Sequence, residues 1–394
     1  MLSLRRLDHP SWMILGILLI AANLRAPVTG IAPLVTMIQD SLGLSAAAAG
    51  LLTSSPLAVF AVVSLLASRV AQRFGLERAL MYALWALVIG IALRSLPSVT
   101  LLFGGNLLAA VGIALGNVLL PSLIKRDFPH QIVTLTGWYA LTMGLAAGLT
   151  SAVAVPLAHL PGLDWRHALA VTGIVATLSA LVWFPQSRRP RPAAPTASSA
   201  KPVSLWRSAL AWQVTLFLGL NSLMYYIVIS WLPAIMQGSG FTATAAGNAH
   251  GLMQLASALA GPAVVPLMRY FKDQRIPVVI LTSCNVIGLL GLWLWPQTAL
   301  VSSALVGFGA GAVLVMALAF VGMRVSTPAQ AAGLSGMAQC VGYLMAAFGP
   351  TFTGKLYDWQ GSWHSTLVLC VVLTLLMGTA GVLAARDRKV DDRN

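Results

Sequence analysis

Charged residues are scarce in this sequence, and their scarcity excludes most soluble proteins. Only 9% of the 394 residues are Asp, Glu, Lys or Arg, whereas 58% are hydrophobic. A soluble domain carries roughly a quarter charged residues, because its surface has to be hydrated. Apolar stretches long enough to cross a bilayer recur along the whole length. The sequence therefore leaves no room for a soluble catalytic domain and indicates a polytopic membrane protein.

Acidic residues are rarer still, with 10 Asp and Glu against 24 Lys and Arg. A formal charge of +14 is also found in proteins that bind nucleic acid. Here, however, the cations stand in small groups between apolar stretches, at alternate loops, as the positive-inside rule requires. We therefore expect membrane lipids as the anionic partner, and no nucleic acid.

Cysteine is almost absent. Cys284, Cys340 and Cys370 are isolated within apolar stretches and form no Cys-x-x-Cys pair, so we interpret them as small buried hydrophobes. An intramembrane enzyme would need buried Asp pairs, a Ser–His arrangement or metal ligands, and a sensor would need a sizeable soluble output domain. Since the sequence offers none of these, we predict no enzyme, no metal and no cofactor.

Twelve apolar stretches predict an all-α protein with twelve transmembrane helices. The predicted spans are 12–33, 46–68, 79–96, 101–124, 133–156, 167–185, 207–235, 245–267, 276–295, 299–323, 331–353 and 363–384. The first span follows two arginines, as in a signal peptide, but it is too long and lacks a clean cleavage site. We expect it to remain as an uncleaved first helix.

The distribution of Lys and Arg predicts the orientation. If the N-terminus is inside, cytoplasmic segments hold 20 of these residues, outer segments hold three, and Arg25 lies within a span. This bias predicts a bacterial inner-membrane protein with both termini in the cytoplasm. Residues 186–206 are polar and rich in Pro, Ala, Ser and Arg, which is typical of a flexible linker. They separate a six-helix half at 1–185 from a second at 207–394.

A faint internal repeat supports two related halves. At an offset of 199, these pairs of similar residues align: Gly112/Gly311, Lys125/Arg324, Pro129/Pro328, Gln131/Gln330 and Gly137/Gly336. Related halves around a central site suit alternating access. Gly112 and Gly116, like Gly144 and Gly148, predict close helix contacts. The glycine-rich run at 307–311 follows no strand, so packing explains it better than a dinucleotide loop.

Arg25 is the most informative residue. It lies about 13 residues, or ~20 Å, into the first span. A charge near the bilayer centre costs roughly 2.5–3.5 kcal/mol and usually faces a cavity or a partner. All ten acidic residues fall outside the predicted spans, so we expect Arg25 to bind a carboxylate-like or electronegative ligand in a water-filled cavity. Snorkelling to the outer interface and pairing with backbone carbonyls are the alternatives. Pro27 and Gly30 predict an interrupted helix.

Polar residues four positions apart share one helix face in three spans of the second half. The pairs are Asn221 with Tyr225, His250 with Gln254, and Gln339 with Tyr343. Asn117 lies mid-span in the first half, whereas Asn23 is about 200° around the helix from Arg25 and should pack elsewhere. Because polar groups avoid lipid, we predict that the three pairs and Asn117 line a polar cavity with Arg25. Interhelical hydrogen bonding is the alternative.

Three further features have two interpretations each. His250, the one histidine within a span, is a candidate proton carrier or a hydrogen-bonding partner. Tyr139 beside Trp138, and Tyr225 beside Tyr226, suit stacking on a flat substrate or plain helix packing. Lys125 and Arg126 end the fourth span, where they suit headgroup anchoring or a gate contact.

Three motifs carry a family resemblance. They are Asn23-Leu24-Arg25-Ala26-Pro27, the helix segment from Phe103-Gly104-Gly105 through Gly112 to Pro121, and Ile124-Lys125-Arg126-Asp127-Phe128-Pro129-His130. They resemble the cyanate permease and 2-nitroimidazole exporter family of the major facilitator superfamily. The resemblance implies a twelve-helix fold and a secondary carrier for a small polar or anionic solute. The superfamily's loop between the second and third helices is degenerate, since Arg73-Phe74-Gly75 is present but Gln72 replaces the usual Asp.

The sequence thus predicts a secondary active transporter, acting as a monomer on a small anionic or electronegative solute by alternating access. Cyanate-like anions and 2-nitroimidazole-like heterocycles are the candidate solutes, and a broader drug efflux transporter is the alternative. The predicted substrate contacts are Arg25, Asn117, Tyr139, Asn221, Tyr225, His250, Gln254, Gln339 and Tyr343. The predicted gating residues are Arg73, Lys125, Arg126 and Arg324.

Overall fold

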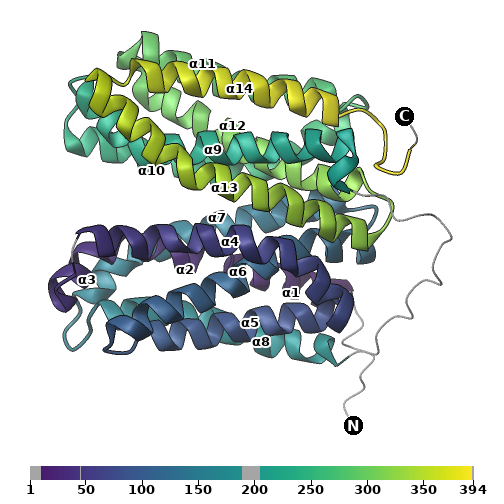
Figure 1. Ribbon diagram of the computed structural model, residues 1–394, viewed down its shortest axis with the longest axis horizontal. Helices are drawn as coiled ribbons and strands as arrows, with labels where there is room; N and C mark the ends of the chain where they lie inside the picture. Colours follow the sequence, from purple (N-terminus) through teal and green to yellow (C-terminus); the bar gives the residue numbers. More distant parts are fainter. Residues whose placement is uncertain (1–9, 45, 189–204, 393–394) are drawn as a thin grey trace. The chain divides into compact units, whose positions relative to one another are not determined.

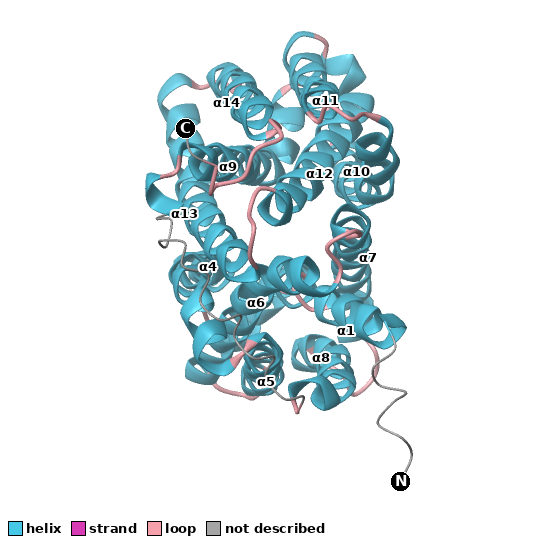
Figure 2. Cartoon of the chain, turned by 90° about the vertical axis from the view of Figure 1, so that its right-hand side faces the viewer, coloured by secondary structure: helices cyan, strands magenta, loops and turns pink. Residues whose placement is uncertain are grey.

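The computed structural model describes residues 10–44, 46–188 and 205–392, and these contain helices and loops but no strand (Figure 2). Twelve helical segments of the described residues are long and apolar enough to cross a membrane, which confirms the predicted twelve spans. Most of the predicted linker, residues 189–204, lies outside the described residues.

The chain forms two compact units. Unit 1 comprises Met1–Leu123 with Thr142–Ser204, and unit 2 comprises Ile124–Leu141 with Leu205–Asn394. The end of one long helix and the start of the next are therefore grouped with unit 2. The division into halves at residues 186–206 stays a prediction.

The elements before the linker begin with a first span made of several pieces (Figure 1). The elements are α1 (Pro10–Ala22), α2 (Ala26–Thr29), η2 (Ala32–Leu34), α3 (Val35–Leu42), α4 (Ala46–Phe74), α5 (Leu76–Arg94), α6 (Val99–Asp127), α7 (Ile132–Ala158) and α8 (Trp165–Ser187). A core cluster of unit 1 joins Ile31, Leu34 and Ile38 to Leu52 of α4 and Trp165 of α8.

The elements after the linker are longer and less interrupted. They are η3 (Leu205–Arg207), α9 (Ala209–Gly238), α10 (Ala243–Tyr270), α11 (Arg275–Leu294), η4 (Pro296–Thr298), α12 (Ala299–Met323), α13 (Pro328–Gln360) and α14 (His364–Ala384). A core cluster of unit 2 joins residues of α9 to α10, α11, α12 and α14, for example Met224 to Met253, Leu289 and Val306.

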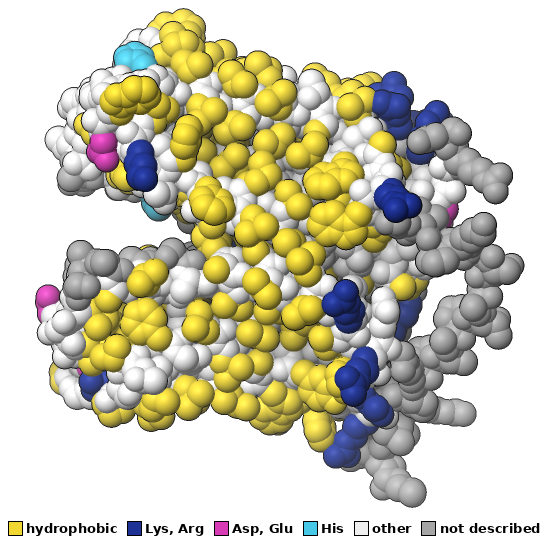
Figure 3. Space-filling model, viewed as in Figure 1, with side chains coloured by type: hydrophobic (Ala, Val, Ile, Leu, Met, Phe, Trp, Pro, Cys, Tyr) yellow, Lys and Arg dark blue, Asp and Glu magenta, His cyan; other side chains and the backbone are white. Residues whose placement is uncertain are grey.

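The outward surfaces of both units are apolar, as lipid contact requires. Large side chains such as Val62, Leu181 and Ile174 in unit 1 and Phe348 in unit 2 are exposed. Figure 3 shows hydrophobic side chains spread over the helices, with Lys and Arg gathered mainly near helix ends. An exposed apolar area of this extent would be an aggregation hazard in water.

Glycines allow the closest helix contacts. A Cβ built at Gly307 would lie 2.1 Å from the Met253 carbonyl oxygen, and one at Gly311 would lie 2.2 Å from the Ser257 carbonyl oxygen. Both contacts join α12 to α10, so the glycine-rich run at 307–311 serves helix packing, as predicted.

The predicted small-residue contacts of the first half are partly correct. A Cβ at Gly112 would lie 2.3 Å from the Ala83 carbonyl oxygen, and one at Gly116 would lie 2.5 Å from Cδ2 of Leu24. Gly148, in contrast, has no atom of the described residues within 4 Å of its Cβ position, so the structure of unit 1 does not show the expected contact there. The spacing of small residues cannot show which face of a helix meets a neighbour.

Proline leaves carbonyl groups without their helical donors, and the fold supplies others. Pro56 lies inside α4 and has no N–H, so the carbonyl of Leu52, four residues earlier, loses its usual partner. Asn106 of α6 donates to that carbonyl from Nδ2 at 2.8 Å. A mid-span asparagine thereby fixes α6 against α4.

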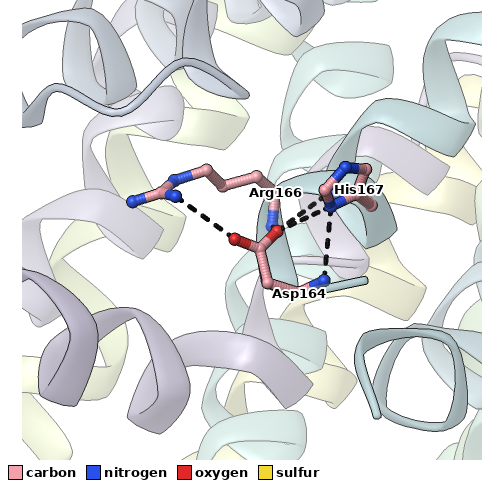
Figure 4. A network of polar contacts seen from close by, with 3 residues as sticks. All are labelled: Asp164, Arg166 and His167. Atoms are coloured by element: carbon pink, nitrogen blue, oxygen red, sulfur yellow. Dashed lines mark hydrogen bonds and ion pairs between the residues drawn. The ribbon is translucent and has the colours of Figure 1, made fainter. Parts of the chain in front are cut away.

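The start of α8 is capped by a small polar network (Figure 4). The Asp164 carboxylate accepts hydrogen bonds from the backbone N–H groups of Arg166 and His167, at 2.9 and 3.3 Å, and contacts both of their side chains. Burial favours a higher pKa for Asp164, but these hydrogen bonds and the charge of Arg166 together hold the pKa below its usual value. The network is therefore a helix cap at an exposed loop.

Replacing Gly311 by Ala is expected to destabilise unit 2. The added methyl group has to displace the α10 backbone, and overpacking of this kind costs about 1–3 kcal/mol. Thermal unfolding in detergent measures the effect. Gly247→Ala on α10 is the matched control, because nothing lies within 4 Å of its Cβ position. Equal unfolding temperatures for the two variants would contradict the assigned packing role.

Candidate functional site

The first span is broken at Arg25. The N–H groups of Asn23 and Leu24 donate to carbonyls three residues back, those of Ile20 and Ala21, at 2.9 and 3.0 Å. Arg25 then stands at the N-cap position of α2 with φ −133° and ψ −39°, directly before Ala26 and Pro27. The predicted interruption is therefore present, and it places the half-buried Arg25 at the break itself.

Carbonyl groups freed around this break accept hydrogen bonds from neighbouring helices of unit 1. The Leu19 carbonyl accepts from Asn23 Nδ2 at 2.8 Å and from Ser179 Oγ of α8 at 3.0 Å. The Thr29 carbonyl, whose helical donor would be residue 33, a proline, accepts from Ser151 Oγ of α7 at 3.2 Å. Asn23 also donates to Ser179 Oγ at 2.8 Å, so it packs away from Arg25 as expected.

Arg94 is a structural residue that the sequence interpretation missed. The charge count assigned it to an outer loop, yet it is the last residue of α5 and is fully buried. Its Nη1 donates to the Pro27 carbonyl at 2.7 Å, and its Nη2 donates to Thr172 Oγ1 of α8 at 3.2 Å. The Pro27 carbonyl lacks its usual helical donor, because the N–H of Ile31 donates to the Val28 carbonyl instead. Arg94 lies inside the predicted span 79–96, and that position was the sequence signal that could have identified it as buried.

Arg94 therefore holds the backbone two residues beyond Arg25. Among the described residues its Nε has no hydrogen-bond partner. Within the part of the chain that the structure describes, the partners of this guanidinium are thus a carbonyl and a hydroxyl rather than a carboxylate.

Asn117 lies on the helix that packs against the other side of the break. It is buried and follows Gly116, whose Cβ position is 2.5 Å from Leu24. Unit 1 thus brings the segment of Arg25 together with the segment of Asn117, as the predicted cavity requires.

Tyr225 and Gln254 are brought together in unit 2. The Tyr225 hydroxyl of α9 donates to Oε1 of Gln254 on α10. Asn221, one turn earlier on α9, donates to the Ala310 carbonyl at 3.2 Å, while its buried Oδ1 lacks a hydrogen bond among the described residues. These three polar side chains lie at the contacts of α9 with α10 and α12.

His250 has a backbone partner that proline created. Pro233 lies inside α9 and offers no N–H to the Ile229 carbonyl. His250 Nε2 lies 3.2 Å from that carbonyl oxygen, which can only accept, so the imidazole donates from Nε2. The hydrogen-bonding interpretation of His250 therefore has a specific physical cause.

The remaining predicted contacts lie on α7 and α13. Tyr139 is fully buried, which favours the packing interpretation, whereas Trp138 is 52% exposed. Gln339 is buried and donates to Ser335 Oγ at 2.9 Å on its own helix, and Tyr343 is half-buried one turn later.

The predicted gating residues have local partners. Arg126 forms a two-point ion pair with Asp127 at 2.6 and 2.9 Å, and the Arg73 guanidinium lies 5.4 Å from the ring centre of Phe74. Arg324 is buried and forms an ion pair with Asp387 at 3.6 Å. Lys125 occupies the last turn of α6.

The expected position of the acidic residues needs a correction. Asp40, Glu77, Asp127 and Asp358 are helical rather than in loops, although each lies within three residues of a helix end. The helices are longer than the predicted apolar spans, so residues just outside those spans are still helical. In the part of the chain that the structure describes, no group of three His, Cys, Asp or Glu residues could hold a metal ion.

Residues 13–347 match the family model described as Major Facilitator Superfamily. The chain is 48% identical over 379 residues to the 2-nitroimidazole transporter of Escherichia coli (strain K12), covering 96% of each chain. It is 29% identical over 366 residues to the cyanate transport protein CynX of the same organism, covering 91% of this chain and 94% of that one. These matches confirm the resemblance predicted from the helix motifs.

A solved structure shows the same fold. The proton:xylose symporter XylE bound to 6-bromo-6-deoxy-D-glucose matches with a TM-score of 0.75 at 15% identity, over 97% of each chain.

Replacing Arg94 by Leu is expected to lower stability and to disturb the break at Arg25. The Pro27 carbonyl and Thr172 would lose their donor, and a buried acceptor left open costs about 1–3 kcal/mol. Thermal unfolding of purified protein measures the loss, with the exposed Arg69→Leu as control. An Arg94→Leu protein as stable as the Arg69→Leu protein would show that the two hydrogen bonds contribute nothing.

Replacing His250 by Phe should likewise lower stability by about 1–3 kcal/mol, because the Ile229 carbonyl would be left without a donor. His250→Gln keeps an N–H donor and should restore most of this loss. We expect the pH profile of transport to be the same in His250→Gln and in the wild type. A stable Gln variant that loses the pH dependence would instead identify His250 as a proton carrier.

Proposed function

This chain belongs to the Major Facilitator Superfamily and is a secondary transporter, and on that premise we propose that it carries a small anionic or electronegative solute by alternating access. The candidate solutes are cyanate-like anions and 2-nitroimidazole-like heterocycles. We further propose that the transporter is a monomer in a bacterial inner membrane with both termini in the cytoplasm, as the bias of 20 cations to three predicts.

The observation that carries the proposal is the position of Arg25. It lies within the candidate span Ser11–Leu34, at the point where the helix is broken and the backbone is held by other helices. A cation at this depth costs several kcal/mol in lipid, so it has to face a cavity or a polar partner. A guanidinium presents a planar fork of donors that fits two coplanar oxygens, as in a carboxylate or a nitro group.

The heterocycle is the better supported of the two solutes. The relative that is 48% identical is named for 2-nitroimidazole, whereas the one named for cyanate is 29% identical. A nitroimidazole also carries ring nitrogens that need donors and acceptors, and unit 2 offers the linked Tyr225 and Gln254. As candidate solute contacts we propose Arg25 and Asn117 in unit 1. Taken by itself, unit 2 offers Asn221, Tyr225 and Gln254 as further candidates, and we propose His250, Gln339, Tyr343 and Tyr139 as supporting residues.

A broader drug efflux transporter is the second candidate. No observation supports it specifically. The exposed apolar surface of the helices is expected of any membrane protein, and the predicted spans contain no Asp or Glu that could relay protons. Expression that raises resistance to several unrelated compounds would favour it, whereas resistance to nitroimidazoles alone would favour the narrower proposal.

Thermal unfolding with added solutes tests the site. A ligand that binds the folded state raises the unfolding temperature with its concentration. We expect 2-nitroimidazole, or failing that cyanate or a small carboxylate, to stabilise the wild type and the exposed-residue control Arg69→Ala. Arg25→Ala should lose this stabilisation and its transport, because the solute loses its main polar contact.

The controls separate a binding defect from a folding defect. The Arg25→Ala protein without solute should unfold as a single species in detergent. The hydrogen bonds from Arg94, Ser151 and Ser179 to the backbone around the break remain in that variant. Equal stabilisation of Arg25→Ala and wild type by the same solute would remove Arg25 from the site.

A further inference from the structure

The chain after α14 is held firmly against unit 2, although a terminal segment is usually poorly ordered unless it is tied down. The buried Arg324 donates from Nε to the Ala384 carbonyl and from Nη2 to the Ala385 carbonyl, both at 2.9 Å. It also forms the ion pair with Asp387, at 3.6 Å. Backbone pairing continues where the N–H of Val390 donates to the Arg324 carbonyl at 2.9 Å.

A further contact fixes the segment to the start of α13. Nε2 of Gln330 donates to Oδ1 of Asp391 at 2.6 Å, and Gln330 itself belongs to the capping box of that helix. The Arg324 guanidinium lies 4.9 Å from the ring centre of Phe320, which holds it in place from the other side. Residues 385–391 are therefore part of the folded unit.

This anchoring places two arginines beside the first residue of α11. A cavity of about 560 Å³ is lined by Arg275, Val382, Leu383, Arg386, Asp387 and Arg388. We call it the arginine cavity. Three of the lining residues are arginines and one, Asp387, is acidic. Asp387 forms an ion pair with Arg324, and the carboxylate of Asp273, which is outside the lining, lies 3.9 Å from Arg275. The lining therefore carries more positive than negative charge.

The arginine cavity has a chemistry suited to a phosphate group. Guanidinium groups bind phosphate oxygens through charge-assisted, two-point hydrogen bonds. Basic pockets between transmembrane helices at the cytoplasmic surface are sites for anionic lipid headgroups. The cavity lies at the end of unit 2 where α14 ends, and the charge bias predicts that end to be cytoplasmic.

Its surroundings favour a lipid over a soluble anion. Val382 and Leu383 form an apolar wall, and α11 and α14 lie side by side (Figure 1). Both helices present exposed apolar side chains beyond the cavity, Ile276 and Val279 on α11 and Leu375 and Leu376 on α14. Figure 3 shows the cations of unit 2 at this end directly beside hydrophobic surface. Acyl chains would find a continuous apolar track there, which a free phosphate would not use.

We propose that the arginine cavity binds the phosphodiester headgroup of an anionic phospholipid from the cytoplasmic leaflet. Arg275, Arg386 and Arg388 contact the phosphate oxygens, and the acyl chains lie along α11 and α14. Arg324 acts as a positioning residue, because it holds the segment that carries Arg386 and Arg388. This site is independent of the transported solute.

Native mass spectrometry of the purified, delipidated protein, titrated with phosphatidylglycerol or phosphatidylcholine, tests the site. We expect phosphatidylglycerol to bind more tightly and to raise the unfolding temperature. The Arg275→Gln/Arg386→Gln protein should bind it more weakly by about fivefold for each arginine replaced. The matched control Arg269→Gln/Lys272→Gln removes the same charge from exposed positions outside the cavity and should bind as the wild type does.

Three results would overturn the proposal. If the control double variant bound phosphatidylglycerol as weakly as the cavity variant, the effect would be one of overall charge. Equal binding of the two lipids would show that the site does not distinguish the headgroup charge. Stabilisation by inorganic phosphate alone, to the same degree, would make this a site for a soluble anion. The single variant Arg388→Gln covers the case in which the first double variant does not fold. It replaces an exposed side chain beyond α14 and should still bind phosphatidylglycerol about fivefold more weakly.

Discussion

The structure depends on one constraint, that a carbonyl freed within a membrane needs a donor from the protein because lipid offers none. Proline frees the carbonyls of Leu52, Thr29 and Ile229, and the break in the first span frees that of Pro27. Side chains of other helices donate to these four groups: Asn106, Ser151, His250 and Arg94. Every such bond also joins two helices of one unit, so the kinks and the packing are stabilised together.

This constraint separates two kinds of polar residue within the spans. One kind bonds to a freed carbonyl of the backbone, as His250 does. Tyr225 and Gln254 instead bond to each other, from α9 to α10. Arg25 lies at the break, and Arg94 and Ser151 donate to carbonyls on its C-terminal side. The polar residues of the spans therefore include some that bond to the backbone and some that bond to one another.

Three arginines with the same chemistry lie in three different surroundings. Arg94 is fully buried and bonds a carbonyl and a hydroxyl, whereas Arg324 is buried at a helix end and bonds two carbonyls and a carboxylate. Arg25 is half-buried at the break. The guanidinium group suits all three because its five donors stay charged and are weakly hydrated. Its neighbours decide whether it holds a helix break, as Arg94 does, or the segment after α14, as Arg324 does.

The sequence by itself determined the twelve spans, the charge bias and the position of the break, because hydropathy, cation spacing and proline act through neighbouring residues. It placed Arg25 beside that break and predicted packing for the glycines at 307–311. It did not predict that Arg94 is buried, that Gly148 has no close neighbour among the described residues, or that His250 donates to the Ile229 carbonyl. Proline spacing shows which carbonyl is freed, but only the tertiary structure decided which side chain reaches it. The donor comes from another helix, as in the bond from Arg94 to Pro27 across 67 residues, and no local pattern records which helix faces are brought together.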